Sequence, residues 1–179
     1  MPRSLALFRA VNLGPHGKLP MAELRAHLAG RGFEDVATYI ASGNLLVTGP
    51  LAGADLEARL EAEVAERFGL TTDVMVRDLP EWSRLVAENP FPQEAADRPS
   101  RLACVVLKSP PAPGGWERLQ AEAPGAEPMR LIGRRLYVFY GEGMADSKLV
   151  GGFIERRLST RGTGRNWNTV LKLHAMLGG

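Results

Sequence analysis

Residues 36–48, VATYIASGNLLVT, decide the expected fold. They contain two short apolar runs, 36–40 and 45–48, on either side of the turn Ala41-Ser42-Gly43-Asn44. Strand-forming residues around a turn with glycine and asparagine are typical of a β-hairpin. The hairpin places two strands in direct succession in a segment that otherwise alternates strands with helices.

The flanking segments complete the pattern. Residues 4–9 predict a strand, and apolar residues at helical spacing predict a helix from Pro20, at the first helical position, to just before Gly30. After the hairpin, residues 56–68 predict a second helix and residues 73–77 a further strand. The resulting order, βαββαβ, is that of ferredoxin-like α+β domains.

The second half of the chain repeats most of this order. Its pattern is βαββα plus an extra helix, with expected strands at 102–107, 129–132 and 135–140 and expected helices at 116–121, about 148–158 and 167–177. We therefore expect a ferredoxin-like α+β half at 1–88, a proline-rich connector at 89–100, and a second α+β half with C-terminal helices at 101–179.

Two of the predicted strands, 5–8 and 102–107, are apolar at every position. Strands of this kind are usually covered on both faces. Because helices cover only one face of a ferredoxin-like sheet, we expect the two halves to pack together as one unit.

The composition excludes several classes of protein. With 45% hydrophobic and 23% charged residues, the 179-residue chain resembles an ordinary soluble protein. Its single cysteine, Cys104, lies in an apolar run and is expected to be buried and reduced. One cysteine and three histidines do not favour a zinc site, and we predict neither a metal nor a cofactor. The absence of a signal peptide or long apolar segment predicts a cytoplasmic protein without membrane contact.

Charge is distributed unevenly along the chain. Residues 1–18 carry a net charge of +3 and residues 148–179 carry +5, whereas residues 19–147 carry −6. Two basic ends around an acidic middle suggest an anion site if the ends meet in space.

The segment from Asn12 to Lys18 is the first candidate site. It joins a predicted strand to a predicted helix and contains Gly14 and Gly17, as a phosphate-binding loop would. Leu19 follows the lysine where a P-loop requires serine or threonine, and Asn12 stands at the first glycine position, so a P-loop ATPase is excluded. Anion binding at the start of the helix and a simple tight connection both remain open.

Residues 161–169 form the second candidate. Asn166 or Asn168 would cap the following helix, and Arg165 would then lie near the positive helix start. Such an arginine requires an anionic ligand or a nearby carboxylate. We expect Trp167 to be a core residue.

Three further motifs have simpler structural explanations. Ser42 and Asn44 are residues that turns favour on backbone grounds alone. Asp146-Ser147 is more typical of a helix N-cap than of a serine nucleophile paired with Lys148. Aromatic residues at 137 and 139 share a strand face, as in RNA-recognition motifs, but the strands that should carry the aromatic signatures are aliphatic.

The motifs together resemble a known family. The motifs are Arg9-Ala10-Val11-Asn12-Leu13-Gly14 with Lys18, Met21-Ala22-Glu23-Leu24, Tyr39-Ile40-Ala41-Ser42-Gly43-Asn44, Asn89-Pro90-Phe91, Ser147-Lys148 and Thr163-Gly164-Arg165-Asn166-Trp167-Asn168-Thr169-Val170. They resemble, in the same order, the motifs of a bacterial family known as domain of unknown function 1697. The resemblance implies an α+β fold with ferredoxin-like elements and implies no activity. Ala10 stands where the family usually has glycine.

The leading hypothesis is a protein that binds a phosphorylated or other anionic small ligand between its halves. The residues expected to bind it are Arg9, Asn12, Lys18, Ser42, Asn44, Lys148, Arg165 and Asn166. One alternative is nucleic-acid binding along a basic stripe formed by the two termini. Another is a small-molecule enzyme that uses His16 or a carboxylate as base. Nothing in the sequence decides the oligomeric state.

Overall fold

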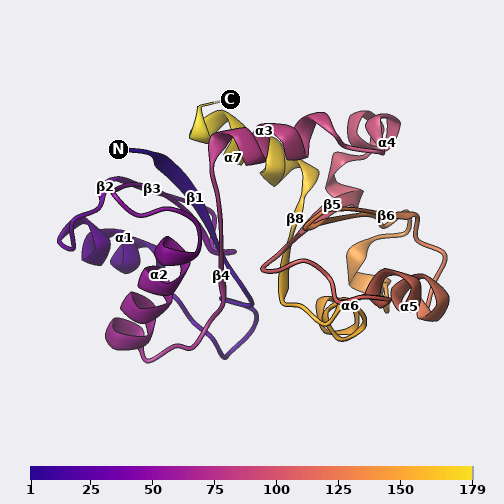
Figure 1. The fold of residues 1–179 in the computed structure, drawn as a ribbon, viewed down its shortest axis with the longest axis horizontal. Coiled ribbons are helices and arrows are strands. Elements are labelled where there is room, and N and C mark those ends of the chain that lie inside the picture. Colours follow the sequence, from indigo (N-terminus) through magenta and orange to yellow (C-terminus); the bar gives the residue numbers. More distant parts are fainter. Residues whose placement is uncertain (179) are drawn as a thin grey trace. The chain divides into compact units, whose positions relative to one another are not determined.

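Two four-stranded antiparallel sheets organise the chain in the computed structural model, which describes residues 1–178 (Figure 1). The chain divides into two units. The first comprises Met1–Arg84 together with the end of the chain from Leu173, and the second comprises Leu85–Lys172. The chain therefore passes from one unit to the other inside a helix on both occasions.

The helices and strands follow one another as β1 (Arg3–Phe8), α1 (Met21–Ala29), β2 (Glu34–Tyr39), β3 (Asn44–Thr48), α2 (Gly53–Phe68), β4 (Val74–Arg77), α3 (Leu79–Ala87), α4 (Pro92–Asp97), β5 (Leu102–Leu107), α5 (Gly115–Glu122), β6 (Met129–Ile132), β7 (Arg135–Phe139), α6 (Gly151–Leu158), β8 (Gly162–Asn166) and α7 (Trp167–Leu177). Short 3-10 helices span Pro99–Arg101 and Met144–Asp146.

The first unit contains the sheet β2-β3-β1-β4. Strand β1 is central and pairs with β3 on one side and β4 on the other. Helices α1 and α2 cover one face of this sheet (Figure 1), and a core that includes Phe8, Leu24, Leu60 and Val74 lies between them. Each such side chain stabilises the fold by about 1.5–3 kcal/mol through burial.

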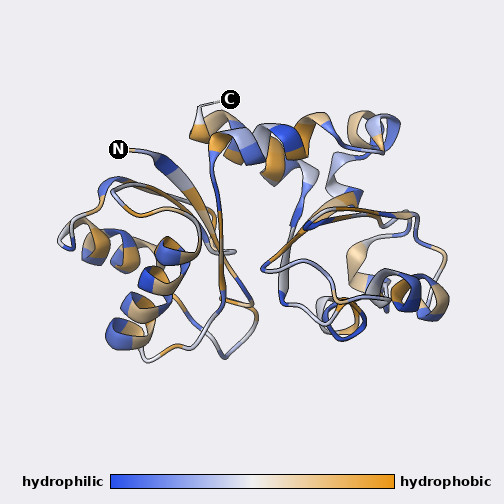
Figure 2. Ribbon diagram, viewed as in Figure 1, coloured by the Kyte–Doolittle hydropathy of each residue, from blue (hydrophilic) through white to orange (hydrophobic). Residues whose placement is uncertain are grey.

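The second unit is built in the same way from the sheet β6-β7-β5-β8. Helices α5 and α6 lie on one face, and the core beneath them includes Val105, Leu119, Ile154 and Leu158. The helices cover the sheets because both have apolar surface to bury. Figure 2 shows that the strands are largely apolar, whereas the helices carry apolar and polar residues on different sides.

These elements confirm the α+β class predicted from the sequence. The hairpin at 36–48 is present as β2 and β3, and Gly69 ends α2 in the left-handed conformation (φ 62°). The apolar strands β1 and β5 are buried along nearly their whole length, as is Cys104. Helix α1 begins at Met21, one residue later than predicted, because Pro20 is its N-cap. No helix among residues 1–178 is long and apolar enough to cross a membrane.

The second unit differs from the prediction in two places. Residues 162–166 form strand β8, which pairs with β5, so the second unit contains a fourth strand before its last helix. The expected helix at 148–158 begins only at Gly151, with Val150 as its N-cap. Ser147 therefore lies too far before the helix to cap it. Its Oγ instead accepts a local hydrogen bond from the Leu149 N–H at 3.0 Å.

The predicted cap of the last helix is present. Asn166 Oδ1 accepts the Thr169 N–H at 3.0 Å, which satisfies one of the free amides of the first turn of α7. We expect Asn166→Ala to lower the free energy of unfolding by about 1 kcal/mol, measured by urea denaturation. Asn168→Ala, which changes an exposed asparagine in the same turn, is the control and should be nearly neutral. Equal losses in the two variants would contradict the capping role.

Candidate ligand-binding site

The connection between β1 and α1 has an unusual backbone. Within ten residues it contains four positions in the left-handed region, namely Ala10 (φ 53°), Asn12 (φ 55°), Gly14 (φ 77°) and Gly17 (φ 67°). Glycine and asparagine adopt this conformation readily, whereas alanine does so at a cost of about 1–2 kcal/mol. The connection is therefore held in a defined shape by the contacts around it.

Asn12 supplies most of those contacts. Its Nδ2 donates to the Leu19 carbonyl at 2.9 Å and to the Ala41 carbonyl at 2.6 Å, while its Oδ1 accepts the Leu19 N–H at 2.8 Å. Its own N–H donates to the Gly17 carbonyl at 2.9 Å. The side chain thus closes the loop on itself and fastens it to the β2–β3 turn.

A cavity of about 480 Å³ lies where this loop, the start of α1 and the end of β2 meet. Its lining consists of Asn12, Gly14, Lys18, Leu19, Pro20, Met21, Thr38, Ile40 and Ala41. Lys18 is the one charged residue of this lining, and most of the other side chains are apolar. Two predicted site residues, Asn12 and Lys18, therefore line the same cavity.

The start of α1 adds to the positive character of the cavity. The first hydrogen bond of the helix runs from the Leu24 N–H to the Pro20 carbonyl at 2.9 Å, and none of the described side chains caps the helix. Uncapped amides at a helix start carry partial positive charge and favour anions. The lining residues Pro20 and Met21 belong to this helix start.

The opposite wall of the cavity contains a strained residue. Ile40 has φ 50°, and its side chain is 51% exposed. A β-branched residue in the left-handed region is a true outlier, and such strain is concentrated at functional sites. The hydrogen bond from Asn12 to the adjacent Ala41 holds this turn in place.

The other predicted residues of the first unit have structural partners. Arg9 lies 3.8 Å from the Asp73 carboxylate. Asn44 is fully buried, and its Nδ2 donates to the Tyr39 carbonyl at 2.9 Å and to the Ser42 hydroxyl at 3.0 Å. Ser42 and Asn44 thus contact each other inside the hairpin turn and are not among the cavity's lining residues.

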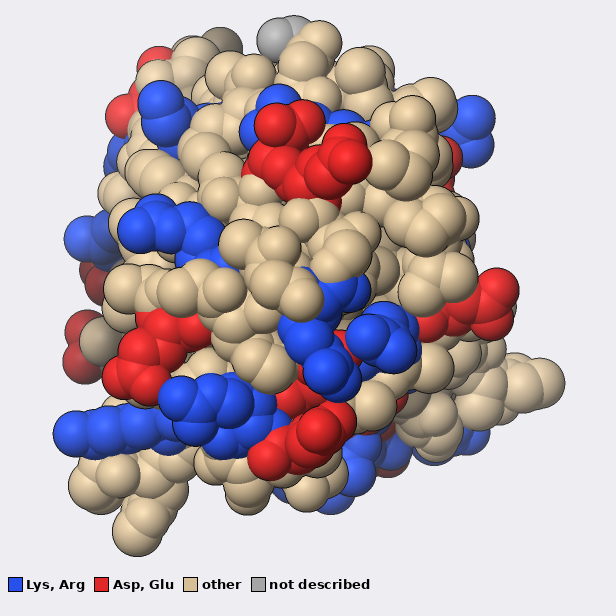
Figure 3. Space-filling view, turned by 90° about the vertical axis from the view of Figure 1, so that its left-hand side faces the viewer, with Lys and Arg blue, Asp and Glu red and all other residues tan. Residues whose placement is uncertain are grey.

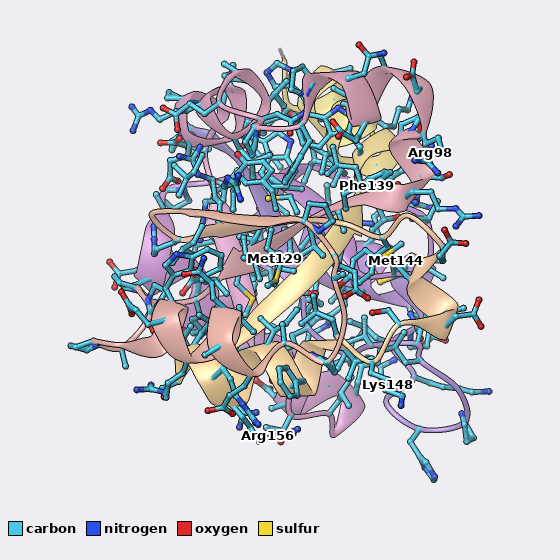
Figure 4. All side chains as sticks on the ribbon, turned by 90° about the vertical axis from the view of Figure 1, so that its right-hand side faces the viewer. Arg98, Met129, Phe139, Met144, Lys148 and Arg156 are labelled. Carbon is cyan, nitrogen blue, oxygen red and sulfur yellow. The ribbon has the colours of Figure 1, made fainter. Side chains whose placement is uncertain are left out.

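The predicted residues of the second unit have different structural settings. Lys148 is exposed, and Figure 4 shows it well away from Arg98 and Phe139. Arg165 is only 7% exposed, its Nη1 donates to the Thr163 hydroxyl at 2.8 Å, and burial lowers its pKa to about 10. Asn166 caps α7, and Trp167 is a core residue that is 4% exposed, as predicted.

Several cations of the two basic segments lie near carboxylates. In the second unit, Arg157 Nε lies 2.7 Å from the Glu122 carboxylate, and Arg161 lies 3.8 Å from Glu155. On the face of the first unit in Figure 3, Lys and Arg side chains lie beside Asp and Glu. Within residues 1–178, His, Cys, Asp and Glu form no group that could hold a metal ion.

One wall of the cavity was not predicted from the sequence. Thr38, Ile40 and Ala41 belong to the end of β2 and the turn after it, yet they line the same space as the loop at 12–18. The sequence did contain a signal in each segment, because the motif at 9–14 and the motif at 39–44 are both among those that resemble the family. Their proximity depends on the pairing of β1 with β3, which brings the turn next to the loop.

Comparison with known proteins agrees with the fold described above. A solved structure described as "The structure of conserved bacterial protein SP0830 from Streptococcus pneumoniae" is similar to the chain, with a TM-score of 0.75 over 98% of both chains and 23% sequence identity. At that identity the likeness concerns the fold alone. No curated protein matches the chain. The family described as "Protein of unknown function (DUF1697)" matches residues 1–137, and the chain belongs to that family.

Proposed function

We propose that this protein binds a small organic anion in the cavity of its first unit. The observation that carries the proposal is the chemistry of the lining, which combines Lys18 and an uncapped helix start with no carboxylate among the described lining residues. A lysine supplies a positive charge, and the free amides of a helix start supply directed donors. Both interactions favour a carboxylate or phosphate group.

The remaining lining defines the rest of the ligand. Leu19, Met21 and Ile40 present apolar surface, and a cavity of about 480 Å³ lies within the usual range for small-molecule sites. The proposal therefore specifies an anionic group attached to an apolar body. It does not require the predicted residues of the second unit.

The arrangement of elements supports a ferredoxin-like assignment for each unit. In both, the element order is βαββαβ, and the central strands are the first and third in each unit. The nucleic-acid alternative has fewer charges to draw on than the sequence suggests, because Arg9, Arg157 and Arg161 each lie within 4 Å of a carboxylate.

Titration with matched probes tests the proposal. Benzoate and phenyl phosphate carry an anionic group on an apolar ring, and benzyl alcohol is the neutral control. We expect at least one anion, but not the alcohol, to bind in calorimetry and to raise the melting temperature. Lys18→Ala should weaken binding about five-fold, a modest effect because Lys18 is exposed to solvent.

Lys172→Ala is the matched control, because Lys172 is an exposed lysine on α7 that does not line the cavity. It should leave the affinity unchanged. If neither anion binds, or if the two lysine variants weaken binding equally, the proposal is wrong.

A further inference from the structure

Helix carboxylates close the outer edges of two strands. Strand β4 lies at one edge of the first sheet, and its Val76 N–H donates to Glu57 Oε1 of α2 at 2.9 Å. In the second unit, the Gly162 N–H of the edge strand β8 donates to Glu155 Oε1 of α6 at 3.0 Å. Backbone groups on an open sheet edge can pair with another chain, and these carboxylates occupy the groups that would do so.

Strand β2 is the other edge of the first sheet, and it lacks such a cover (Figure 1). Among the described residues, no side chain and no backbone group outside β3 hydrogen-bonds to the backbone of residues 36–38. These residues are only partly buried. The outer edge of β2 is therefore open to pairing.

The strand register shows which backbone groups face that edge. Hydrogen-bonded and non-hydrogen-bonded pairs alternate along an antiparallel ladder. The Phe8 N–H donates to the Gly43 carbonyl, which places the backbone groups of the next residue, Asn44, on the β2 side. Asn44 is paired with Tyr39, so the N–H and C=O of Tyr39 face β3 and those of Thr38 face the outer edge.

The open edge leads into the cavity of the first unit. Thr38 lines that cavity together with Ile40 and Ala41, so the cavity lies at the C-terminal end of β2. Lys18 and the uncapped start of α1 belong to the same lining. A chain that pairs with Thr38 and runs parallel to β2 would therefore end beside a positive charge and free helix amides.

We infer that the anion bound in this cavity is the C-terminal carboxylate of an extended peptide, which adds to the sheet as a strand beside β2. This inference rests on the proposed function and names the class of its ligand. The terminal carboxylate complements Lys18 and the helix start, which are the charged and polar donors of the lining. In strand addition, main-chain hydrogen bonds supply affinity and side-chain pockets supply specificity.

The apolar part of the lining then receives a side chain of the peptide. Leu19, Met21 and Ile40 surround the end of the path that the peptide would follow along β2. The last residue of the peptide is therefore expected to be apolar, and the residue before it pairs with Thr38. All the residues involved belong to the first unit.

Three probes separate the contributions of the carboxylate and the strand. They are the acetylated peptide Thr-Val-Thr-Leu with a free carboxylate, the same peptide with a C-terminal amide, and N-acetylleucine. In calorimetry, we expect the peptide acid to bind about ten-fold more tightly than N-acetylleucine, because pairing with Thr38 adds two backbone hydrogen bonds. The peptide amide lacks the negative charge and should bind about ten-fold more weakly than the peptide acid.

Amide hydrogen exchange of the intact protein, measured by NMR, locates the peptide. The Thr38 N–H should exchange rapidly in the free protein and about ten-fold more slowly when the peptide acid saturates the site. The Val76 N–H, which Glu57 holds on the opposite edge, is the control and should exchange at the same rate in both states. Thr38→Pro removes the outward N–H without removing a bond to β3, and it should abolish the gain of the peptide acid over N-acetylleucine.

The wild-type measurements decide the inference without reference to any variant. Equal affinity of the peptide acid and N-acetylleucine, or unchanged exchange at Thr38 in the saturated complex, overturns the inference and leaves the anion site in place. If N-acetylleucine, the peptide acid, benzoate and phenyl phosphate all fail to bind, the proposed function is wrong as well. If Thr38 is protected in the free protein and loses protection on dilution, a second copy of the chain occupies β2, which also overturns the inference.

Discussion

Gly43→Ala is expected to lower the free energy of unfolding by about 3 kcal/mol. Gly43 lies in the β2–β3 turn with φ 84°, where an alanine costs about 1–2 kcal/mol. Its added Cβ would also lie 2.6 Å from Val11 Cγ2 and 2.9 Å from Phe8 Cβ. Overpacking of this kind costs a further 1–3 kcal/mol or so. Urea denaturation of both proteins measures the difference.

Gly32→Ala separates the two causes. Gly32 has nearly the same φ, 86°, but no atom lies within 4 Å of the position of its Cβ. We expect this control to lose only the backbone cost, about 1–2 kcal/mol. If both alanine variants lose the same stability, the contact with Val11 and Phe8 has no energetic weight and our explanation is wrong.

The same substitution bears on the proposed anion site. Gly43 follows Ala41 and Ser42 in the turn that forms one wall of the cavity, and its carbonyl accepts the Phe8 N–H at 2.8 Å. A shift of the turn would pull Ala41 away from Asn12, whose amide holds the loop at 12–18. Gly43→Ala should therefore weaken anion binding as well as stability.

The first unit could be predicted well because its strands are recognisable from their amino-acid composition. Residues 4–9 and 36–48 are apolar and interrupted by turn residues, which are local signals. Strand β8 has the sequence Gly-Thr-Gly-Arg-Asn, which lacks any apolar alternation. It is a strand because its backbone pairs with β5. Gly162 is needed in this strand, since a Cβ there would lie 2.9 Å from side-chain atoms of Leu107 and Val105. Such a requirement comes from tertiary structure and is invisible in the local sequence.

The candidate sites were predicted less completely for a related reason. The glycines and lysine at 12–18 suggested an anion site, and Lys18 does line a cavity. Ile40 was not predicted as part of it, because strand pairing brings it there from a distant part of the chain. The hydrogen bond between Ser147 and Glu127 was also not predicted, since Ser147 was interpreted as a helix cap and Glu127 lies 20 residues earlier. Contacts of this range leave no periodic signal.

Glu63→Gln is expected to lower the free energy of unfolding by about 2 kcal/mol at neutral pH. Glu63 on α2 is 2% exposed and interacts with His27 at 2.7 Å, Arg31 at 3.1 Å and Arg59 at 2.6 Å. Removing one partner of a buried ion pair costs about 3–5 kcal/mol. We expect less here, because Arg31 and Arg59 are about two-fifths exposed and solvent screens their charges.

Glu66→Gln is the matched control. Glu66 lies on the same helix and is 70% exposed, and its carboxylate is 3.7 Å from Arg31. An exposed pair of this kind contributes less than about 1 kcal/mol. Comparable losses in the two variants would show that burial of the Glu63 carboxylate has no energetic consequence.

The stability difference between wild type and Glu63→Gln should also depend on pH. Burial raises the pKa of Glu63, but hydrogen bonds from His27 and Arg31 and the charge of Arg59 outweigh it, so the pKa lies below its ordinary value of 4.5. A depressed carboxyl pKa stabilises the folded state above the unfolded pKa, and this contribution is lost as pH falls through the folded pKa. Urea denaturation at pH 5.5 and 3.5 should therefore show a smaller difference between the two proteins at the lower pH. A difference that stays constant or grows on acidification would mean that Glu63 is not held as a carboxylate by the cations that join α1 to α2.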